Sequence, residues 1–432
     1  MPAIVAAPPR TAPAFRILHA FTYAKKSEGS SPAGRLLVGP GGVLYGTTQG
    51  GGVGKNAFGG TVYSLTPQGG GYRESVLHYF TGDQHPSLDG AHPASGVVAD
   101  RAGNLFGTTT YGGTDSGSGY GTVFELRRSG ARYVERVLHR FAVADPSSDG
   151  TFPTAAPIVA SDGSLYGTTT AGGGGACNIS GPGCGTVYRL ERTATGYAER
   201  ILYRFRGGSD GAYPAPSLVA DHSGTLFGTT AYGGSVCPNS GQGCGTVFKL
   251  TALGAGYRES VLYRFRGGAG DGANPAGTVL PGAGGALYGT TEFGGAGSCA
   301  TALFNAPSCG TLYALVPSGA TYSESVLHNF LGGADGFRPQ STLVAGNNGY
   351  LYGATFEGGT GTCFVYAGYN FGCGTVFRAS PIGGVDVIYN FGRGSSGDAP
   401  SDVVVSPAGT LFGTTPENWT GNGVGTAYAL TL

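Results

Sequence analysis

Three glutamates stand at positions where they could carry out acid–base chemistry. A pentapeptide of the type Leu-(Tyr/Phe)-Gly-Thr-Thr recurs along the chain, and after its last three copies one of the next two residues is Glu292, Glu357 or Glu417. Two carboxyl groups on either side of a glycosidic bond can act as general acid and as nucleophile or base. These residues therefore allow a glycoside hydrolase, although 25 acidic residues spread over a repetitive chain also produce such neighbours by chance.

A second set of residues would suit elimination from a uronate-containing polysaccharide. His92, Tyr213 and Arg338 each stand directly before a proline in a repeated loop. His or Tyr could serve as the base, and Arg could neutralise the uronate carboxylate. The residue before this proline differs in every unit, which suggests recognition by a variable tip on a constant frame: Ser31, His92, Phe152, Tyr213, Asn274, Arg338 and Ala399.

Aromatic residues in the same loops favour a third interpretation, binding without catalysis. Their rings could lie against the CH faces of sugars while polar side chains orient the hydroxyl groups. The candidates are Tyr111, Tyr232, Phe293, Phe356 and Trp419. We therefore expect a monomer that binds an extracellular polysaccharide or oligosaccharide and needs no cofactor or metal. A polysaccharide hydrolase or lyase is the alternative, and a protein-interaction scaffold comes third.

The cysteines indicate the compartment. They fall into four pairs, each inside one loop, and the second Cys of each pair directly precedes Gly-Thr: Cys177 and Cys184, Cys237 and Cys244, Cys299 and Cys309, Cys363 and Cys373. An even count at short spacing predicts four local disulfides, because a zinc site would need further ligands close by. Each bridge would contribute about 2.5 kcal/mol by the chain-entropy model. We expect an oxidising, extracellular or cell-surface location.

The spacing of the pentapeptide predicts the fold. Its seven copies begin at Leu44, Leu105, Leu165, Leu226, Leu287, Leu351 and Leu411, 60 to 64 residues apart. Each unit reads as four short strands rich in β-branched and aromatic residues, such as residues 216–220, 225–230, 245–250 and 257–265. Seven four-stranded units without a helical period predict a seven-bladed β-propeller. The connections after the second and fourth strands are long and fall on one face, where loops can build a site.

The two ends of the chain predict how the ring closes. Residues 15–21 resemble a lone fourth strand, and residues 425–430 resemble a lone third strand, so each end lacks what the other supplies. If the first strand completes the last blade, the final sheet keeps no unpaired edge. We therefore expect a single all-β domain over residues 15–432, preceded by a flexible segment, residues 1–14.

Composition argues against several partners. Only 12% of the residues are charged, with 25 basic against 25 acidic, so no basic patch for nucleic acid or an anionic membrane surface is indicated. No segment approaches the roughly 18 apolar residues of a membrane span. The 85 glycines do not indicate disorder, because 40% of the residues are hydrophobic and the glycines recur at fixed intervals.

Almost the whole chain resembles the GloVer tandem-repeat proteins, which are built from units of this kind. The likeness is strongest where residues 203–214 (YRFRGGSDGAYP) return as residues 263–275 (YRFRGGAGDGANP). The resemblance implies a bacterial protein that is exported and either attached to the surface or secreted. It implies no catalytic motif.

Overall fold

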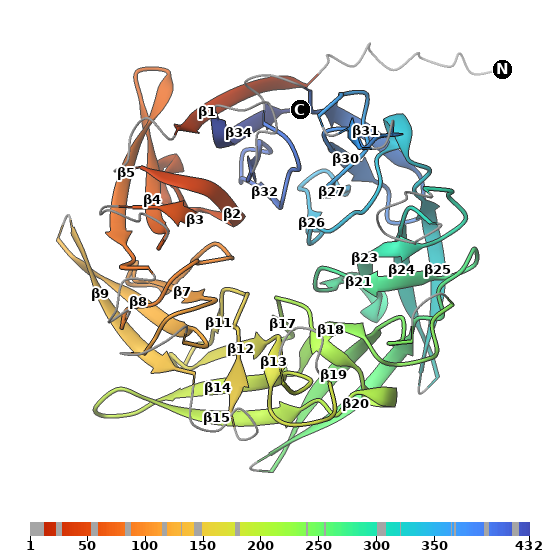
Figure 1. Cartoon of the computed structure of the whole chain (residues 1–432), viewed down its shortest axis with the longest axis horizontal. Helices are drawn as coiled ribbons and strands as arrows, with labels where there is room; N and C mark the ends of the chain where they lie inside the picture. Colours follow the sequence, from red (N-terminus) through yellow and green to blue (C-terminus); the bar gives the residue numbers. More distant parts are fainter. Residues whose placement is uncertain are drawn as a thin grey trace.

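The computed structural model shows a closed ring of seven antiparallel sheets around a central channel (Figure 1). It describes residues 13–22, 28–52, 59–82, 88–114, 119–130, 132–141, 149–177, 182–238, 241–254, 256–299, 308–319, 321–363, 365–366, 369–392, 397–416 and 423–432. The predicted seven-bladed β-propeller is confirmed.

The four strands of each blade run from the channel outwards, and blades 1 to 7 are numbered in chain order. The innermost strands are β2 (Gly29–Val38), β6 (Val98–Ala99), β11 (Ile158–Val159), β17 (Val219–Ala220), β22 (Leu280–Pro281), β26 (Val344–Ala345) and β32 (Val403–Val405). The second strands are β3 (Leu44–Gly51), β7 (Leu105–Thr109), β12 (Leu165–Thr169), β18 (Leu226–Tyr232), β23 (Leu287–Gly294), β27 (Leu351–Thr355) and β33 (Leu411–Thr415).

The outer half of each blade is a hairpin. The third strands are β4 (Thr61–Gln68), β8 (Thr122–Ser129), β14 (Thr186–Arg192), β19 (Thr246–Leu253), β24 (Thr311–Ser318), β30 (Thr375–Ala379) and β34 (Gly423–Thr431). The outermost strands are β5 (Gly71–Tyr79), β9 (Arg132–Arg140), β15 (Tyr197–Arg204), β20 (Gly256–Arg264), β25 (Thr321–Asn329), β31 (Val385–Asn390) and β1 (Ala14–Thr22).

Short accessory elements lie in the connections. The strands are β10 (Gly150–Thr151), β13 (Ala171–Gly172), β16 (Ala212–Pro214), β21 (Gly272–Pro275), β28 (Val365–Tyr366) and β29 (Tyr369–Asn370). The 3-10 turns are η1 (Pro40–Gly42), η2 (Gly208–Asp210), η3 (Ala283–Gly285) and η4 (Gly333–Asp335).

The two ends of the chain close the ring in one sheet. Strand β1 pairs antiparallel with β34, and the order of this sheet is β1-β34-β33-β32. The register aligns Ala14 with Thr431 and Ala20 with Thr426. The predicted closure by one N-terminal and three C-terminal strands is therefore confirmed. The two ends of the chain form one blade together, so the N-terminal strand covers the edge of β34. The flexible segment expected over residues 1–14 falls almost wholly outside the described residues.

The pentapeptide supplies the core of each blade. Its Leu is buried, as Leu165 is, and its Gly lies opposite the aromatic residue of the third strand, as Gly167 lies opposite Tyr188. A side chain on Gly167 would collide with the Tyr188 ring. Glycine at this position thus lets a large, buried ring cross the neighbouring strand. Phe141 from the preceding blade packs edge-on against that ring, with centroids 5.2 Å apart.

The two threonines of the pentapeptide form buried hydrogen bonds between and within blades. The first Thr hydroxyl donates to a carbonyl of the segment that leads to the innermost strand of the next blade, as Thr108 does to Ala155 at 2.9 Å. The second Thr hydroxyl contacts the hydroxyl that opens the third strand of its own blade, as Thr109 and Thr122 do at 2.9 Å. The first threonine thus ties neighbouring blades together, and the second ties two strands of one blade.

Candidate functional site

The loop face carries a ring of strained backbone positions around the channel mouth. The residue before the repeated proline has a positive φ in every blade, between +53° and +59°: Ser31, His92, Phe152, Tyr213, Asn274, Arg338 and Ala399. Such a conformation costs a residue with a side chain about 1 kcal/mol or more relative to its ordinary conformations. The seven variable tips predicted from the sequence therefore share one backbone geometry and differ only in their side chains.

Hydrogen bonds across the blade seam fix this geometry. The N–H of Arg338 donates to the carbonyl of Cys309 in the preceding blade at 3.1 Å, and the Arg338 carbonyl accepts from Phe356 N–H at 3.0 Å. The tip is thereby fixed between two loops, and one of them is braced by the disulfide of Cys309.

At the seam of blades 5 and 6, Arg338 joins two of the predicted glutamates. Its Nε lies 2.8 Å from Glu292 Oε1, and its Nη1 lies 2.7 Å from Glu357 Oε1. Glu292 Oε1 also accepts from Gln340 Nε2 at 2.9 Å. Glu292 comes from blade 5, whereas the other three belong to blade 6, so the cluster crosses the seam. The side chains of Arg338, Glu292 and Glu357 are only 13%, 19% and 13% exposed.

The charge of this cluster is unbalanced, since two carboxylates surround one guanidinium. Burial raises the pKa of Glu357, and Arg338 offsets that shift only in part. The two carboxylates in turn raise the pKa of Arg338. Glu357 Oε2 is shielded from solvent and has no hydrogen-bond partner among the described residues. The cluster therefore holds a buried carboxylate oxygen without a hydrogen bond, which is unusual in a folded protein.

Two of the predicted aromatic residues flank the cluster. The Arg338 guanidinium carbon lies 5.9 Å from the ring centre of Phe293 and 5.5 Å from that of Phe356. Both rings are partly exposed. Such cation–π contacts hold the guanidinium in place beside an apolar wall.

Across the ring, blades 2 and 3 present an aromatic arc. His92 and Tyr111 lie edge to face with centroids 5.6 Å apart, and Tyr111 and Phe152 do so at 5.7 Å. Tyr111 is 42% exposed, so its ring is available at the surface. This arc lies on the opposite side of the channel from the Arg338 cluster (Figure 1).

The structure places the other predicted site residues as follows. Tyr213 is only 3% exposed and packs edge to face against the partly exposed Tyr232 at 5.8 Å, because its side chain belongs to the core between blades 3 and 4. The three residues of the lyase hypothesis, His92, Tyr213 and Arg338, thus occupy three separate blades. Glu417 and Trp419 lie outside the described residues.

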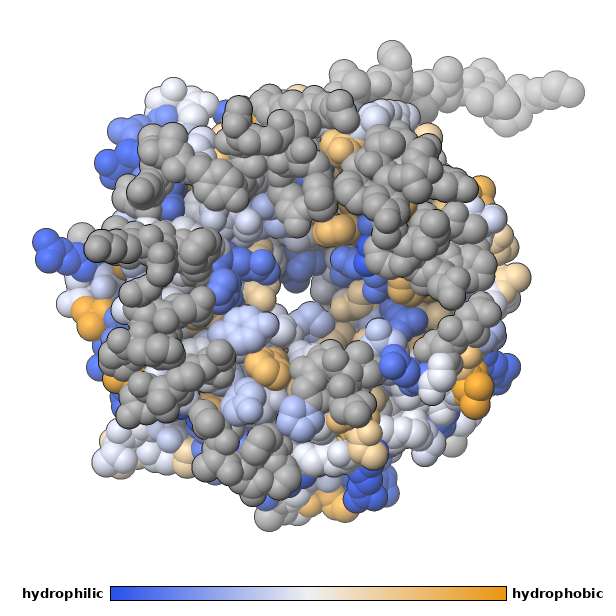
Figure 2. All heavy atoms as spheres, viewed as in Figure 1, coloured by the Kyte–Doolittle hydropathy of each residue, from blue (hydrophilic) through white to orange (hydrophobic). Residues whose placement is uncertain are grey.

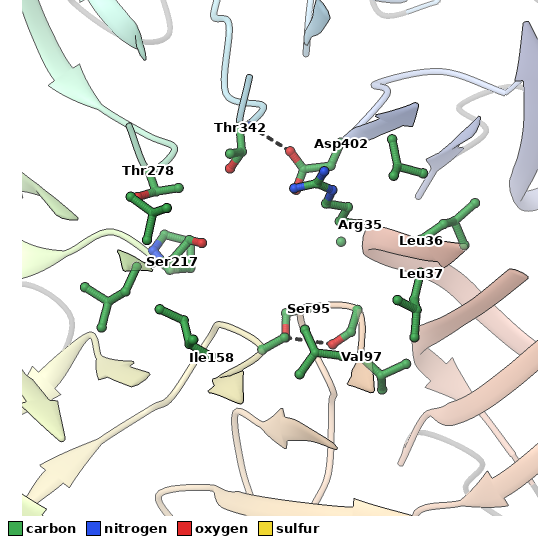
Figure 3. Close-up of a pocket in the computed structure, with 18 of the residues that line it drawn as sticks. Arg35, Leu36, Leu37, Ser95, Val97, Ile158, Ser217, Thr278, Thr342 and Asp402 are labelled. Carbon is green, nitrogen blue, oxygen red and sulfur yellow. Dashed lines mark hydrogen bonds between the residues drawn. The ribbon is translucent and has the colours of Figure 1, made fainter. Parts of the chain in front are cut away.

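The channel below the mouth carries polar residues that the sequence did not single out. It encloses a cavity of about 770 Å³ lined by the innermost strands, and the ring is hollow at its centre (Figure 2). Asp402 and Arg35 come from neighbouring blades 7 and 1, and Asp402 Oδ1 accepts from Thr342 N–H at 2.7 Å (Figure 3). Burial raises the pKa of Asp402, while that hydrogen bond and Arg35 act against the shift. In the sequence, Asp402 and Arg35 could have been noticed only as charged residues in or beside the innermost strands, where charge is unusual.

All four predicted disulfides form, each within one loop between second and third strands: Cys177–Cys184, Cys237–Cys244, Cys299–Cys309 and Cys363–Cys373. They indicate an oxidising, exported environment. In the described part of the chain, no helix is both long and apolar enough to cross a membrane.

The fold and the disulfides define an exported seven-bladed β-propeller. A family model described as the Gloeobacter/Verrucomicrobia repeat matches residues 8–239 and 118–364. The chain belongs to this family, as its repeated units indicated. A comparison with curated proteins found no match.

Several solved structures are similar to this chain over most of its length, at low identity. The periplasmic gluconolactonase PpgL of Pseudomonas aeruginosa is 15% identical, with 89% of this chain and 97% of that chain covered and a TM-score of 0.48. A gluconolactonase from Xanthomonas campestris is 13% identical, with coverages of 98% and 96% and a TM-score of 0.40. A protein from Lactobacillus plantarum is 11% identical, with coverages of 82% and 83% and a TM-score of 0.44. At this identity the likeness concerns the fold and carries no information about a ligand.

Proposed function

We propose that this exported propeller binds an extracellular oligosaccharide at the mouth of its channel, over the seam of blades 5 and 6. The supporting observation is the Arg338 cluster, in which a guanidinium, two carboxylates and the Gln340 amide lie beside the rings of Phe293 and Phe356. Sugar hydroxyls both donate and accept hydrogen bonds, and sugar CH faces pack on aromatic rings. The site offers both kinds of contact on a rigid frame.

The charge of the cluster favours a neutral saccharide over a uronate. Arg338 is already paired with Glu292 and Glu357, so an incoming carboxylate would meet one surplus negative charge. Like charges at short range disfavour binding by a few kcal/mol where water is largely excluded. This arrangement supports the lyase alternative less well, because that mechanism requires an arginine with charge to spare.

Glycoside hydrolysis is the second candidate, and the two glutamates favour it. Burial raises the pKa of Glu357, and Glu292 lies on the other side of the same guanidinium. A pair of carboxyl groups in different environments can divide the roles of acid and base. The aromatic rings beside them would then position the substrate.

The test uses the purified, non-reduced protein with neutral and uronate-containing oligosaccharides. Calorimetry measures binding, reducing ends report hydrolysis, and absorbance of unsaturated uronate reports elimination. We expect binding of a neutral saccharide, weakened at least tenfold by Glu292→Gln or Phe356→Ala. The matched control is Glu191→Gln, at the opposite end of the blades, which should bind like the wild type.

The outcomes separate the candidates. Binding without product supports the proposal, and new reducing ends that disappear in Glu357→Gln support the hydrolase. Unsaturated product would instead restore the lyase hypothesis and contradict the charge argument. Neither binding nor product with any saccharide would refute carbohydrate recognition and favour a protein-interaction scaffold.

A further inference from the structure

A second group of functional side chains lies at the outer edge of the seam between blades 2 and 3, apart from the Arg338 cluster. His139 belongs to β9 of blade 2, Asp149 to the loop that follows it, and Glu199 to β15 of blade 3. His139 Nε2 lies 3.6 Å from Asp149 Oδ2 and 3.8 Å from Glu199 Oε1. One ligand atom from each residue lies within 4.8 Å of the other two.

This spacing is close to that of a bound metal ion. Ligand atoms about 2.1 Å from a divalent ion are separated from one another by roughly 3.0 to 3.5 Å, so small side-chain movements would complete the geometry. One imidazole and two carboxylates form a donor set that suits Zn²⁺ and related first-row ions. The side chains of His139, Asp149 and Glu199 are 20%, 10% and 16% exposed, so the group lies just below the surface.

Two of the three ligand atoms are buried without a partner. His139 Nε2 and Glu199 Oε1 are both shielded from water and form no hydrogen bond within the described structure. Buried polar atoms in native proteins are normally satisfied, and exceptions call for an explanation such as a bound ion. Burial, repulsion from Asp149 and a side-chain hydrogen bond to Asp149 raise the pKa of Glu199 to about 8, with Arg204 acting against the shift. A cation between the carboxylates would relieve that repulsion.

The other seams show why this one differs. At the equivalent position Tyr203 and Tyr263 donate their hydroxyls to Asp210 and Asp271 at 2.9 Å, so a proton donor fills the space. At the seam of blades 1 and 2 the equivalent residues are His78, Asp89 and Glu135, and His78 Nε2 lies 3.5 Å from Asp89 Oδ2. His78 Nε2 and Glu135 Oε1 are also buried without a hydrogen bond among the described residues, but Asp89 there already accepts from the backbone N–H and the hydroxyl of Thr81.

The seam of blades 5 and 6 lacks the third ligand. His328 contacts Asp335 directly at 3.0 Å, and Val385 stands where Glu199 stands in blade 3. Among the described residues, His139, Asp149 and Glu199 are the only such trio whose ligand atoms meet.

We propose that His139, Asp149 and Glu199 bind a divalent metal ion, with Zn²⁺ as the best match, that ties blade 2 to blade 3. Histidine fills the same strand position in other blades, as at His78, and the sequence predicts no metal. The site is independent of the oligosaccharide proposal, because it lies at the seam of blades 2 and 3 and shares no residue with the Arg338 cluster.

The decisive variant replaces the histidine by the residue found at the same position in the next two blades. His139→Tyr places at this seam the residue that blades 3 and 4 use at the same position, so the variant should fold while losing the imidazole ligand. The matched control is His78→Tyr, the same substitution one blade earlier. Both proteins are prepared with disulfides intact and stripped with a chelator, and their melting temperatures without metal are compared first.

Zn²⁺ titration by calorimetry and Co²⁺ titration by visible absorption then measure binding. We expect one ion per chain in the wild type and in His78→Tyr, and at least 100-fold weaker binding in His139→Tyr. No binding by the wild type would overturn the proposal and leave a proton shared by the carboxyl groups. Equal binding by His139→Tyr would overturn it as well, because the ion would then sit elsewhere.

Discussion

Two adjacent positions of the same repeated loop differ in how much they vary: one is proline in all seven blades, and the other is a different residue in each. The repeated proline of this loop lies next to the glycine that precedes the Thr of the third strand in the preceding blade, and this pair recurs at all seven seams, as with Pro339 and Gly310. The residue before it, such as Arg338, is different in every blade although its backbone is the same. Positions that hold the blades together are thus fixed, while the neighbouring side chains around the mouth vary.

The contrast matters because glycine would be the easiest residue for the variable position. A φ near +55° favours glycine, yet none of the seven residues is glycine. The backbone therefore does not explain the choice of residue, and at Arg338 the side chain forms the two ion pairs of the proposed site. We therefore look for function at the positions that share one backbone conformation but carry different side chains.

The largest expected effect comes from breaking the constant layer with Gly310→Ala. Gly310 has φ +93°, and an added Cβ would collide with the Thr291 carbonyl and lie 2.7 Å from Pro339 Cδ. Strain and overlap together should lower the free energy of unfolding by about 3 kcal/mol or more. Urea denaturation of the two proteins measures this difference.

Gly319→Ala provides the control for this prediction. Gly319 also has a positive φ, +63°, but a Cβ there would meet nothing within 4 Å. Its substitution should cost about 1 kcal/mol, from the backbone alone. Equal losses in the two variants would show that the contact across the seam is unimportant.

A change of pH should have a smaller effect on the free energy of unfolding, through a glutamate on the outermost strand of blade 5. Burial and the nearby Asp271 raise the pKa of Glu324 to about 8, while in the unfolded chain it has its usual value near 4.5. Between pH 4.5 and pH 8 the folded protein therefore keeps a proton on Glu324 that the unfolded chain has released. The resulting stability is complete below pH 4.5 and disappears as pH rises through 8. Because solvent partly screens this carboxyl group, we expect a loss of about 2 kcal/mol between pH 5 and pH 8, roughly half of the full linkage value.

Glu324→Gln isolates that contribution, because glutamine does not titrate. Unfolding of both proteins at pH 5, 6, 7 and 8 should show a flatter profile for the variant, which becomes the more stable protein at pH 8. A variant profile parallel to that of the wild type would place the pH dependence in other groups, such as Glu199 and Glu259, whose pKa values are raised to about 8 and about 7.

The constant layer could be predicted from the sequence, because a seven-fold repeat reports every structural position seven times. The strands, the ring closure and the four disulfides followed from spacing alone. Glu292 and Glu357 could be named as a pair because they follow the repeated pentapeptide in adjacent blades. Their common partner could not be assigned, since Arg338 reaches both only through the register of one loop against two blades.

The variable positions resisted prediction for physical reasons. Tyr213 and Tyr111 are both tyrosines of the mouth loops, yet Tyr213 is 3% exposed and Tyr111 is 42% exposed, and this depends on neighbouring blades. Asp402 and Arg35 occupy the channel only because the inner strands converge there. His139 shares its strand position with other histidines, so only the approach of Glu199 from the next blade distinguishes it.

The smallest expected effect is an increase in the free energy of unfolding, at one of the variable residues around the mouth. Ala399 has φ +53° and contributes only a buried methyl group, so Ala399→Gly should raise the free energy of unfolding by about 0.5 kcal/mol, the relief of backbone strain exceeding the lost entropy of glycine. Arg338→Gly relieves the same strain but removes both ion pairs, so it should weaken oligosaccharide binding at least tenfold while Ala399→Gly leaves binding unchanged. Chemical denaturation and calorimetry on the two variants give both quantities. A destabilised Ala399→Gly would mean that the tip side chains serve the frame after all, and the division between a fixed layer and a variable, functional one would fail.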